Sequence, residues 1–149
     1  MMFARMVGLT FFLIFAATAA RAELALRPGE ELTFRVAWGI FGNAGEIKIR
    51  AETEMNDGKR FLVVTTTTST QGVLRRLFPF QAQAESIYDM GTQRITVHTE
   101  SSASNKKKTN LALEFDYVNS VMKFTDFMDS AKNKVVPIPP ASHADQRQG

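Results

Sequence analysis

The amino-acid sequence predicts an all-β protein: an antiparallel meander that forms a strongly bent sheet or a partly open barrel. Three observations indicate this fold. Several short stretches carry a hydrophobic residue at every second position, turn residues separate them at nearly regular intervals, and no long stretch has helical periodicity. Alternation of this kind places one side of a strand on a core and the other in water.

The alternating stretches define eight short strands. The predicted strands occupy residues 31–38, 46–54, 60–69, 81–88, 93–102, 109–117, 121–128 and 134–138. Glycines between residues 39 and 45 predict a turn after the first strand. Asn56 to Lys59 predict a hairpin, because Asp57 and Gly58 tolerate positive φ. Residues 72–78 are apolar and basic and stop at Pro79, which predicts a short helical turn.

The N-terminal residues have the layout of a secretory signal peptide. Arg5 gives a positive start, an apolar run follows from Val7 to Ala17, and a small-x-small site ends at Ala22. We therefore expect cleavage between Ala22 and Glu23. The apolar run is about half of the roughly 20 residues that cross a bilayer, so we expect no transmembrane anchor in the mature chain.

The signal peptide sets the predicted domain organisation and the localisation. We expect a signal peptide over residues 1–22, a single β domain over residues 23–140 and a disordered tail over residues 141–149. Export through a cleaved signal predicts a periplasmic protein. Stability is then expected to come from the apolar core alone, because the sequence contains no cysteine for disulfides.

Charge and cysteine content exclude several classes of function. Removing Arg5 and Arg21 with the signal from the 18 Lys and Arg residues leaves 16, against 15 Asp and Glu residues. A charge so close to balance gives no reason to expect nucleic acid as a partner. The lack of cysteine excludes thiol nucleophiles and zinc-thiolate or iron-sulfur sites, and we expect no cofactor and no metal.

The sequence shows no catalytic motif. The two histidines are His98, in a predicted strand, and His143, in the predicted tail. Glu100 follows His98 by two residues and so shares its face, an arrangement more typical of a solvated charge pair than of a catalytic base. Asn105 to Lys108 form a basic hairpin tip that can touch phosphate or anionic head groups, although a soluble edge is the commoner explanation. We expect a protein that is not an enzyme.

Four aromatic residues are the candidate ligand-binding residues: Trp38, Phe41, Phe78 and Phe80. Three of them flank predicted turns rather than strand centres, where an aromatic side chain can line the mouth of a barrel. Core packing is the alternative explanation for each of them.

The order of several blocks resembles one known family. These blocks are Leu32 to Ile40 with Gly42 to Glu46, then Ser69 to Gly72 with Leu77 to Phe80, then Ala84 to Asp89, and finally Val136 to Pro140. Together they resemble the bacterial exported proteins of the domain of unknown function 3108 family. The resemblance implies a periplasmic all-β domain without an assigned activity.

One part of the pattern differs from that family. Its members usually continue past the double proline with a helix and several more strands, whereas here Ala141 to Gly149 complete the sequence. We therefore expect either the N-terminal part of a longer domain or a chain that needs a partner. An unpaired sheet edge and an uncovered apolar face would follow.

Three hypotheses for the function result. The first is non-enzymatic binding of an apolar or lipid-like ligand, or of an envelope component, in the bent sheet. The second is a structural or assembly module that pairs with an envelope protein through an open sheet edge. The third, and weakest, is an enzyme of envelope polymers that uses Glu85, Glu100 and His98.

Overall fold

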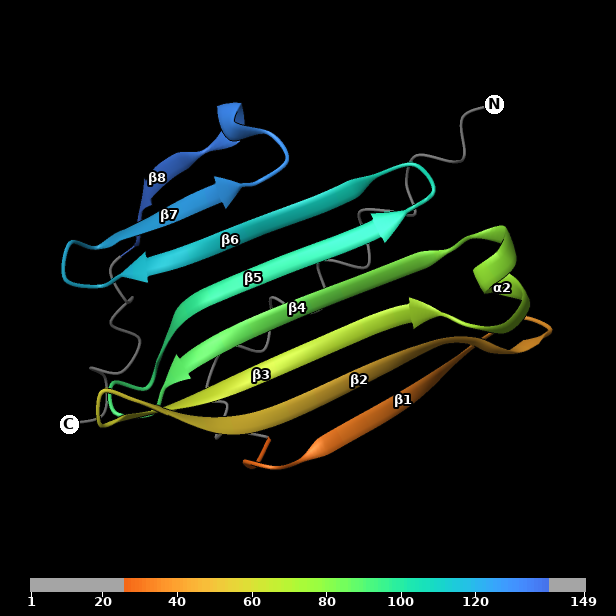
Figure 1. Ribbon diagram of the computed structural model, residues 1–149, viewed down its shortest axis with the longest axis horizontal. Coiled ribbons are helices and arrows are strands. Elements are labelled where there is room, and N and C mark those ends of the chain that lie inside the picture. The colour runs from red at the N-terminus through yellow and green to blue at the C-terminus, as the bar shows by residue number, and fades with distance from the viewer. Residues whose placement is uncertain (1–25, 140–149) are drawn as a thin grey trace, which may run out of the picture.

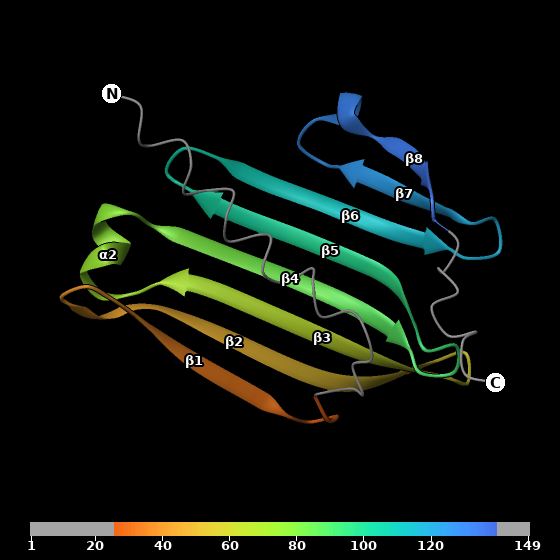
Figure 2. The same ribbon diagram turned by 180° about the vertical axis from the view of Figure 1, so that it is seen from behind.

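A computed structural model describes residues 26–139 as one sheet of eight antiparallel strands in chain order. Figures 1 and 2 show this single layer from its two sides. The sheet stays open, with the first and last strands at its edges. The predicted signal peptide, its cleavage site between Ala22 and Glu23 and the predicted tail over residues 141–149 lie outside the described residues.

The prediction of an all-β meander with a short helix is confirmed. The elements are β1 (Glu31–Trp38), β2 (Phe41–Asn56), β3 (Lys59–Thr70), α2 (Gly72–Leu77), β4 (Phe80–Asp89), β5 (Arg94–Ser104), β6 (Lys108–Asp116), β7 (Val121–Asp126), the 3-10 turn η1 (Ser130–Lys132) and β8 (Lys134–Pro137). Most boundaries lie within one or two residues of those predicted, because Gly, Asn and Asp mark the turns clearly.

The expected turn over residues 39–45 is correct only at its first two residues. Only Gly39 and Ile40 form the connection, and β2 already begins at Phe41. Gly45 is a strand residue that pairs with Thr70, and a Cβ atom there would lie 3.0 Å from the backbone oxygen of Ser69. Glycine at this position therefore permits a close approach of two strands rather than a turn.

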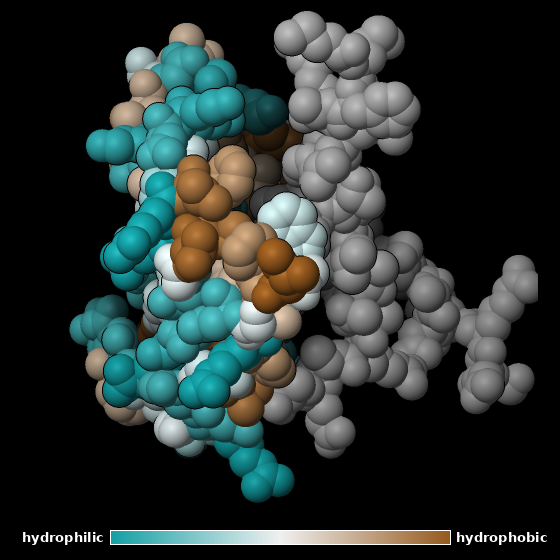
Figure 3. Space-filling model, turned by 90° about the vertical axis from the view of Figure 1, so that its right-hand side faces the viewer, coloured by the Kyte–Doolittle hydropathy of each residue, from teal (hydrophilic) through white to brown (hydrophobic). Residues whose placement is uncertain are grey.

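The register gives the sheet one apolar face and one polar face. Directly paired residues share a face, so the pairs Phe34–Ile47 and Leu113–Phe124 place large apolar side chains together. The opposite face carries the ion pairs of Glu46 with Lys48, Arg50 with Glu52, and Glu114 with Lys123. Figure 3 views the sheet from its α2 end and shows hydrophilic side chains mostly on one side of the layer, with hydrophobic ones gathered toward the other.

The core is small and lies mostly in β2 and β3, with Leu74 of α2 and Ala112 of β6 as its other buried residues. Ala51 is completely buried and Leu62 is 1% exposed, and both lie on the apolar face. Many other apolar side chains are only half-buried, since no second layer covers the sheet within residues 26–139. A single sheet with a broad apolar face is the architecture on which the candidate site is built.

Aspartates close the turns at the end of the sheet opposite α2. Asp89 Oδ1 accepts hydrogen bonds from the backbone N–H groups of Gly91 (2.7 Å) and Thr92 (3.1 Å). Asp116 Oδ1 accepts from Val118 and Asn119 in the same way, at 3.0 Å each. These donors stabilise the carboxylates, so the pKa of each aspartate lies below its ordinary value.

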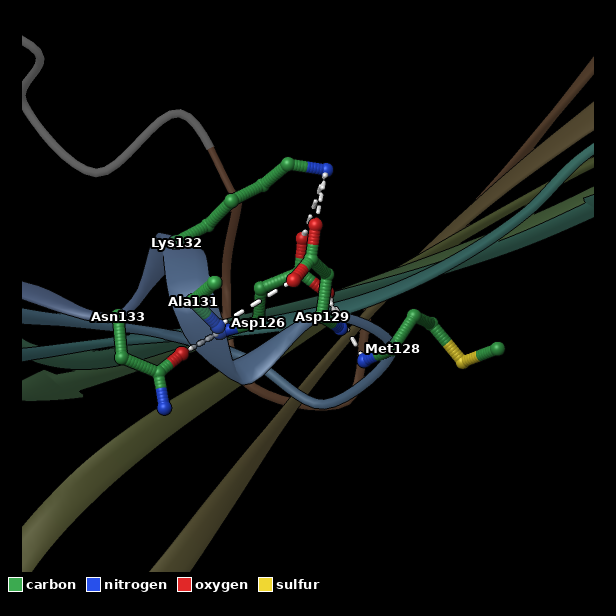
Figure 4. A network of polar contacts seen from close by, with 6 residues as sticks. All are labelled: Asp126, Met128, Asp129, Ala131, Lys132 and Asn133. Atoms are coloured by element: carbon green, nitrogen blue, oxygen red, sulfur yellow. Dashed lines mark hydrogen bonds and ion pairs between the residues drawn. The ribbon is translucent and has the colours of Figure 1, made fainter.

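A polar network orders the connection between β7 and β8 (Figure 4). Lys132 Nζ lies 3.1 Å from Asp129 and 3.9 Å from Asp126, and Asp126 Oδ1 accepts from the backbone of Met128 at 2.8 Å. The hydrogen bond from Lys132 lowers the pKa of Asp129, and Asp129 in turn raises the pKa of Lys132. This network holds the short β8 at the sheet edge.

Candidate functional site

A strip of mostly short side chains, with His98 and Glu100 among them, crosses the middle of the apolar face. We call it the central strip. It consists of face-sharing residues of β3, β4 and β5: Thr66, Thr68, Ala82, Ala84, Ser86, His98, Glu100 and Ser102. Their register is fixed by direct pairs such as Thr66–Ala84 and Ala84–Glu100. All of these residues are half-buried.

Large apolar side chains lie on both sides of the central strip. Toward β1 the face continues with Leu32, Phe34, Ile47 and Ile49, and toward β8 it continues with Leu111, Leu113, Phe115, Met122 and Phe124. We call these two groups the flanks. Because Ala, Ser and Thr side chains are shorter than Leu, Ile and Phe, the strip leaves space that the flanks border.

The central strip contains one hydrogen-bonded pair of polar side chains. Ser86 Oγ and His98 Nδ1 lie 2.8 Å apart, facing each other across β4 and β5. A serine hydroxyl beside an imidazole is one element of a nucleophile–base pair, but a catalytic base also needs a third group that orients the ring. Within residues 26–139 the only side-chain hydrogen bond of His98 is this one. The pair, together with Glu100 and the hydroxyl groups of the strip, offers a ligand polar contacts between the two apolar flanks.

The structure separates the carboxylates that sequence reasoning had grouped. Glu100 lies on the apolar face beside Leu111, whereas Glu85 pairs with Thr99 on the polar face. Instead of the expected charge pair with Glu100, His98 forms a hydrogen bond with the hydroxyl of Ser86. Glu85 therefore cannot act together with His98 and Glu100, because the sheet lies between them.

Three of the four predicted aromatic residues lie at the end of the sheet next to α2, on the apolar face. Trp38 and Phe41 pair across the β1–β2 hairpin, and strand alternation places Phe80 on the same face as Ala82. Trp38 is 65% exposed, Phe80 is exposed as well, and Phe41 is half-buried. These side chains extend the apolar face at this end.

Phe78, the fourth predicted residue, lies in the connection between α2 and β4 and is also 65% exposed. Thr70 holds this connection: its Oγ1 donates to the backbone oxygen of Phe78 at 3.1 Å and accepts from the backbone N–H of Phe80 at 3.0 Å. The predicted residues are therefore brought to one end of the molecule by two different connections.

The helix α2 is fixed to the start of β2. The N–H of Gln71 donates to the backbone oxygen of Ala44 at 3.0 Å, and Leu74 is the buried residue of the helix. Gly72 has a φ of 55°, and a Cβ atom there would lie 3.0 Å from the backbone oxygen of Asn43. Glycine is thus required at this position both by the backbone conformation and by the close contact.

Two further classes of site are not found in the part of the chain that the structure describes. Residues 26–139 contain no group of three or more His, Asp or Glu side chains arranged to hold a metal ion. None of the helices in this range has the length and apolar character that crossing a membrane requires.

Sequence reasoning missed the central strip. The register that brings Ser86 opposite His98 depends on long-range pairing, which a single sequence does not reveal. A signal was nevertheless present: Ala82, Ala84 and Ser86 form a run of small residues at every second position of β4. In an antiparallel strand such a run predicts one face without large side chains.

Comparison with known proteins identifies the family. No curated protein and no solved structure matches the chain. A family described as "Protein of unknown function (DUF3108)" matches residues 33–145, which is most of the chain. This range includes the central strip, both flanks except Leu32, and all four predicted aromatic residues. The chain belongs to the family of proteins of unknown function DUF3108.

Proposed function

We propose that this protein is a non-enzymatic periplasmic protein that binds an apolar or lipid-like ligand on the apolar face of its sheet. The ligand lies along the central strip between the two flanks. The periplasmic location follows from the predicted signal peptide, and the ligand class follows from the side chains of the face.

One observation carries the proposal: within residues 26–139 no second layer covers the apolar face, whose middle carries Ala, Ser and Thr side chains beside His98 and Glu100 while its sides carry large apolar ones. Exposed apolar surface of this extent is characteristic of sites for partners or ligands. An extended acyl chain laid on Ala82 and Ala84 has Thr66 and Glu100 directly beside it, and Ile49 and Leu111 lie one strand further out on the two sides.

The chemistry of such a site makes the affinity depend on chain length. Each buried methylene contributes about 0.8 kcal/mol. Shortening a saturated fatty acid by two methylenes should therefore weaken its binding roughly tenfold. A ligand held only by charge would show no such dependence.

The test replaces one strip residue and one matched residue on the other face. Ala84→Phe fills the middle of the central strip, whereas Gln83→Phe adds the same ring to the polar face of the same strand. Binding is measured by displacement of a fluorescent fatty acid from the purified protein, and native mass spectrometry of protein purified from its host detects ligand already bound. Circular dichroism and the melting temperature establish that each variant folds.

We expect Ala84→Phe to weaken binding at least tenfold and Gln83→Phe to leave it within about twofold. Ala82→Leu gives a milder second variant if Ala84→Phe fails to fold. Protein that is purified free of lipid and takes up no fatty acid would contradict the proposal, and so would equal effects of the two phenylalanines.

A second candidate function is supported by the open edge of the sheet. Within residues 26–139, β1 pairs on one side only and is eight residues long without a proline. Unpaired backbone groups of such an edge can add a strand from another protein. Because the chain has no cysteine, Thr33→Cys gives a single cross-linking position in β1. A defined envelope protein trapped in intact cells would support this function, and a clean monomer would contradict it.

A further inference from the structure

The α2 end of the sheet gathers exposed apolar side chains from two separate connections. Ile40 in the β1–β2 turn is 94% exposed, and Trp38, Val73, Leu77 and Phe78 are each more than half exposed. Figure 3 faces this end and shows a group of hydrophobic side chains with hydrophilic ones above and below it. Of the α2 residues, only Leu74 is buried, so most of this apolar surface does not serve the core.

The same end carries a cluster of cations. Arg75 and Arg76 form the last turn of α2, and Lys106, Lys107 and Lys108 lie at the β5–β6 turn. The two groups are neighbours, because a cleft of about 380 Å³ is lined by Arg75 and Phe80 on one side and by Ser104 and Asn105 on the other. Figure 1 shows α2 and the β5–β6 turn at the same end of the sheet.

The turns at this end carry no acidic residue, and Glu46, in the cross-strand row of Ser69 and Ala103, is paired with Lys48 at 3.4 Å. Residues 37–45, 71–80 and 103–110 contain five Lys and Arg residues and no Asp or Glu. Among residues 26–139, none of these five cations forms an ion pair. The nearest acidic side chains along the β6–β7 edge, Asp126 and Asp129, are engaged with Lys132.

Exposed apolar side chains combined with unopposed cations match the interface of an anionic membrane. Trp and Phe rings enter the headgroup region, while Lys and Arg bind lipid phosphates and extend their apolar stems along the surface. Each Lys or Arg near an anionic bilayer strengthens binding about fivefold. Either feature alone gives weak attachment, and the two together give stable attachment.

We propose that the α2 end of the sheet binds the surface of a bilayer that contains anionic phospholipid. Trp38, Ile40, Leu77 and Phe78 insert at the interface, and the five cations bind the headgroup phosphates. Arg75 lies at the cleft beside the polar groups of Ser104 and Asn105, which a phosphate oxygen can also contact. This proposal stands without the proposed lipid ligand, since it uses the end of the sheet and not its central strip.

The test is flotation of the purified protein with vesicles of phosphatidylcholine alone or mixed with phosphatidylglycerol. We expect binding to the mixed vesicles only, and we expect it to weaken as salt shortens the screening length from about 10 Å at 0.1 M to about 3 Å at 1 M. Trp38 is the single tryptophan of the chain, so a blue shift of its emission reports insertion of this end.

Two matched pairs of substitutions locate the binding surface. Arg75→Gln with Arg76→Gln removes two charges from α2, and Lys59→Gln with Arg60→Gln removes two from the hairpin at the opposite end. The first pair should weaken binding roughly 25-fold, and the second should leave it within about twofold. Leu77→Ser, an exposed position, should weaken binding and reduce the emission shift without changing the melting temperature.

Three outcomes would overturn the proposal. They are equal binding to both kinds of vesicle, equal effects of the two charge-removing pairs, and binding without a change in Trp38 emission. Retained vesicle binding in Ala84→Phe with loss of fatty acid binding would separate this surface from the ligand site. Loss of vesicle binding in the α2 variants with normal fatty acid uptake would separate them in the other direction.

Discussion

The α2 end of the sheet exposes more large apolar side chains than the opposite end, where Met55 and Val118 are the most exposed. At the end opposite α2, Asp89 and Asp116 each accept two backbone hydrogen bonds and close the turns locally. At the α2 end, Thr70 and Ser104 form comparable bonds to the backbone of the turns, whereas Arg75 and Ile40 are exposed and, among the described residues, their side chains form none. Polar groups that satisfy the backbone stabilise the fold. Exposed apolar and basic side chains that form no bond to the backbone are available for contacts with a partner.

The largest expected difference between the two ends is in the free energy of unfolding, and two leucines test it. Leu62 is 1% exposed between β2 and β4, and Leu74 is 7% exposed beneath α2. Leu62→Ala should lower the free energy of unfolding by about 2–5 kcal/mol, because the cavity lies in the small core. Leu74→Ala should lower the free energy of unfolding by less. It should raise amide hydrogen exchange mainly in residues 71–78, since α2 can open locally. Equal losses with uniform exchange would contradict a separable α2 end.

Alanine substitutions at two glycines, one at each end of the sheet, should have a smaller effect on stability. Gly58 in the β2–β3 hairpin has a φ of 74° and open space around its Cβ position, whereas Gly72 has a φ of 55° and a backbone oxygen at 3.0 Å. Alanine at either site costs about 1–2 kcal/mol for the left-handed conformation. Gly72→Ala should lower the melting temperature more, because it also pushes α2 from β2. Equal melting temperatures would show that the contact with Asn43 does not hold the helix.

Much of this architecture could be predicted from the sequence, because the signals for strands and turns lie in neighbouring residues. Alternation in β1 and the Asn56–Lys59 hairpin signal depend only on neighbouring residues, so the strands and the order of the meander were correct. The start of β2 was misplaced because Gly45 serves a close strand contact that the sequence does not distinguish from a turn.

The candidate sites depended on long-range pairing and were harder to predict. Trp38 and Phe78 were selected for their places beside turns, and the structure gathers them at one end. The bond between Ser86 and His98, and the neighbourhood of Arg75 and Asn105, join residues far apart in the chain. Strand register and the packing of α2 decide these contacts, and neither has a local signal.

The smallest effect is the pH dependence of the aspartate-capped end. The pKa of Asp89 and of Asp116 lies below the ordinary value of 3.8, so both carboxylates are stabilised in the folded state. Their contribution to stability is present above pH 3.8 and is lost as the pH falls through the lowered folded-state pKa. Asp89→Asn with Asp116→Asn should flatten the loss of stability in acid, measured by urea unfolding across this range. Parallel curves for the variant and the wild type would contradict the capping role.

The central claim is that an apolar chain lies on the apolar face of the sheet, along the central strip. Trp38 lies on that face with Phe41, so it reports contact with a bound chain. The most direct measurement is quenching of Trp38 emission by a fatty acid that carries bromine on its acyl chain, in wild type and in Ala84→Phe. We expect quenching in the wild type that saturates with ligand and is lost in Ala84→Phe. Unquenched emission in the wild type, or equal quenching in both, would contradict the claim.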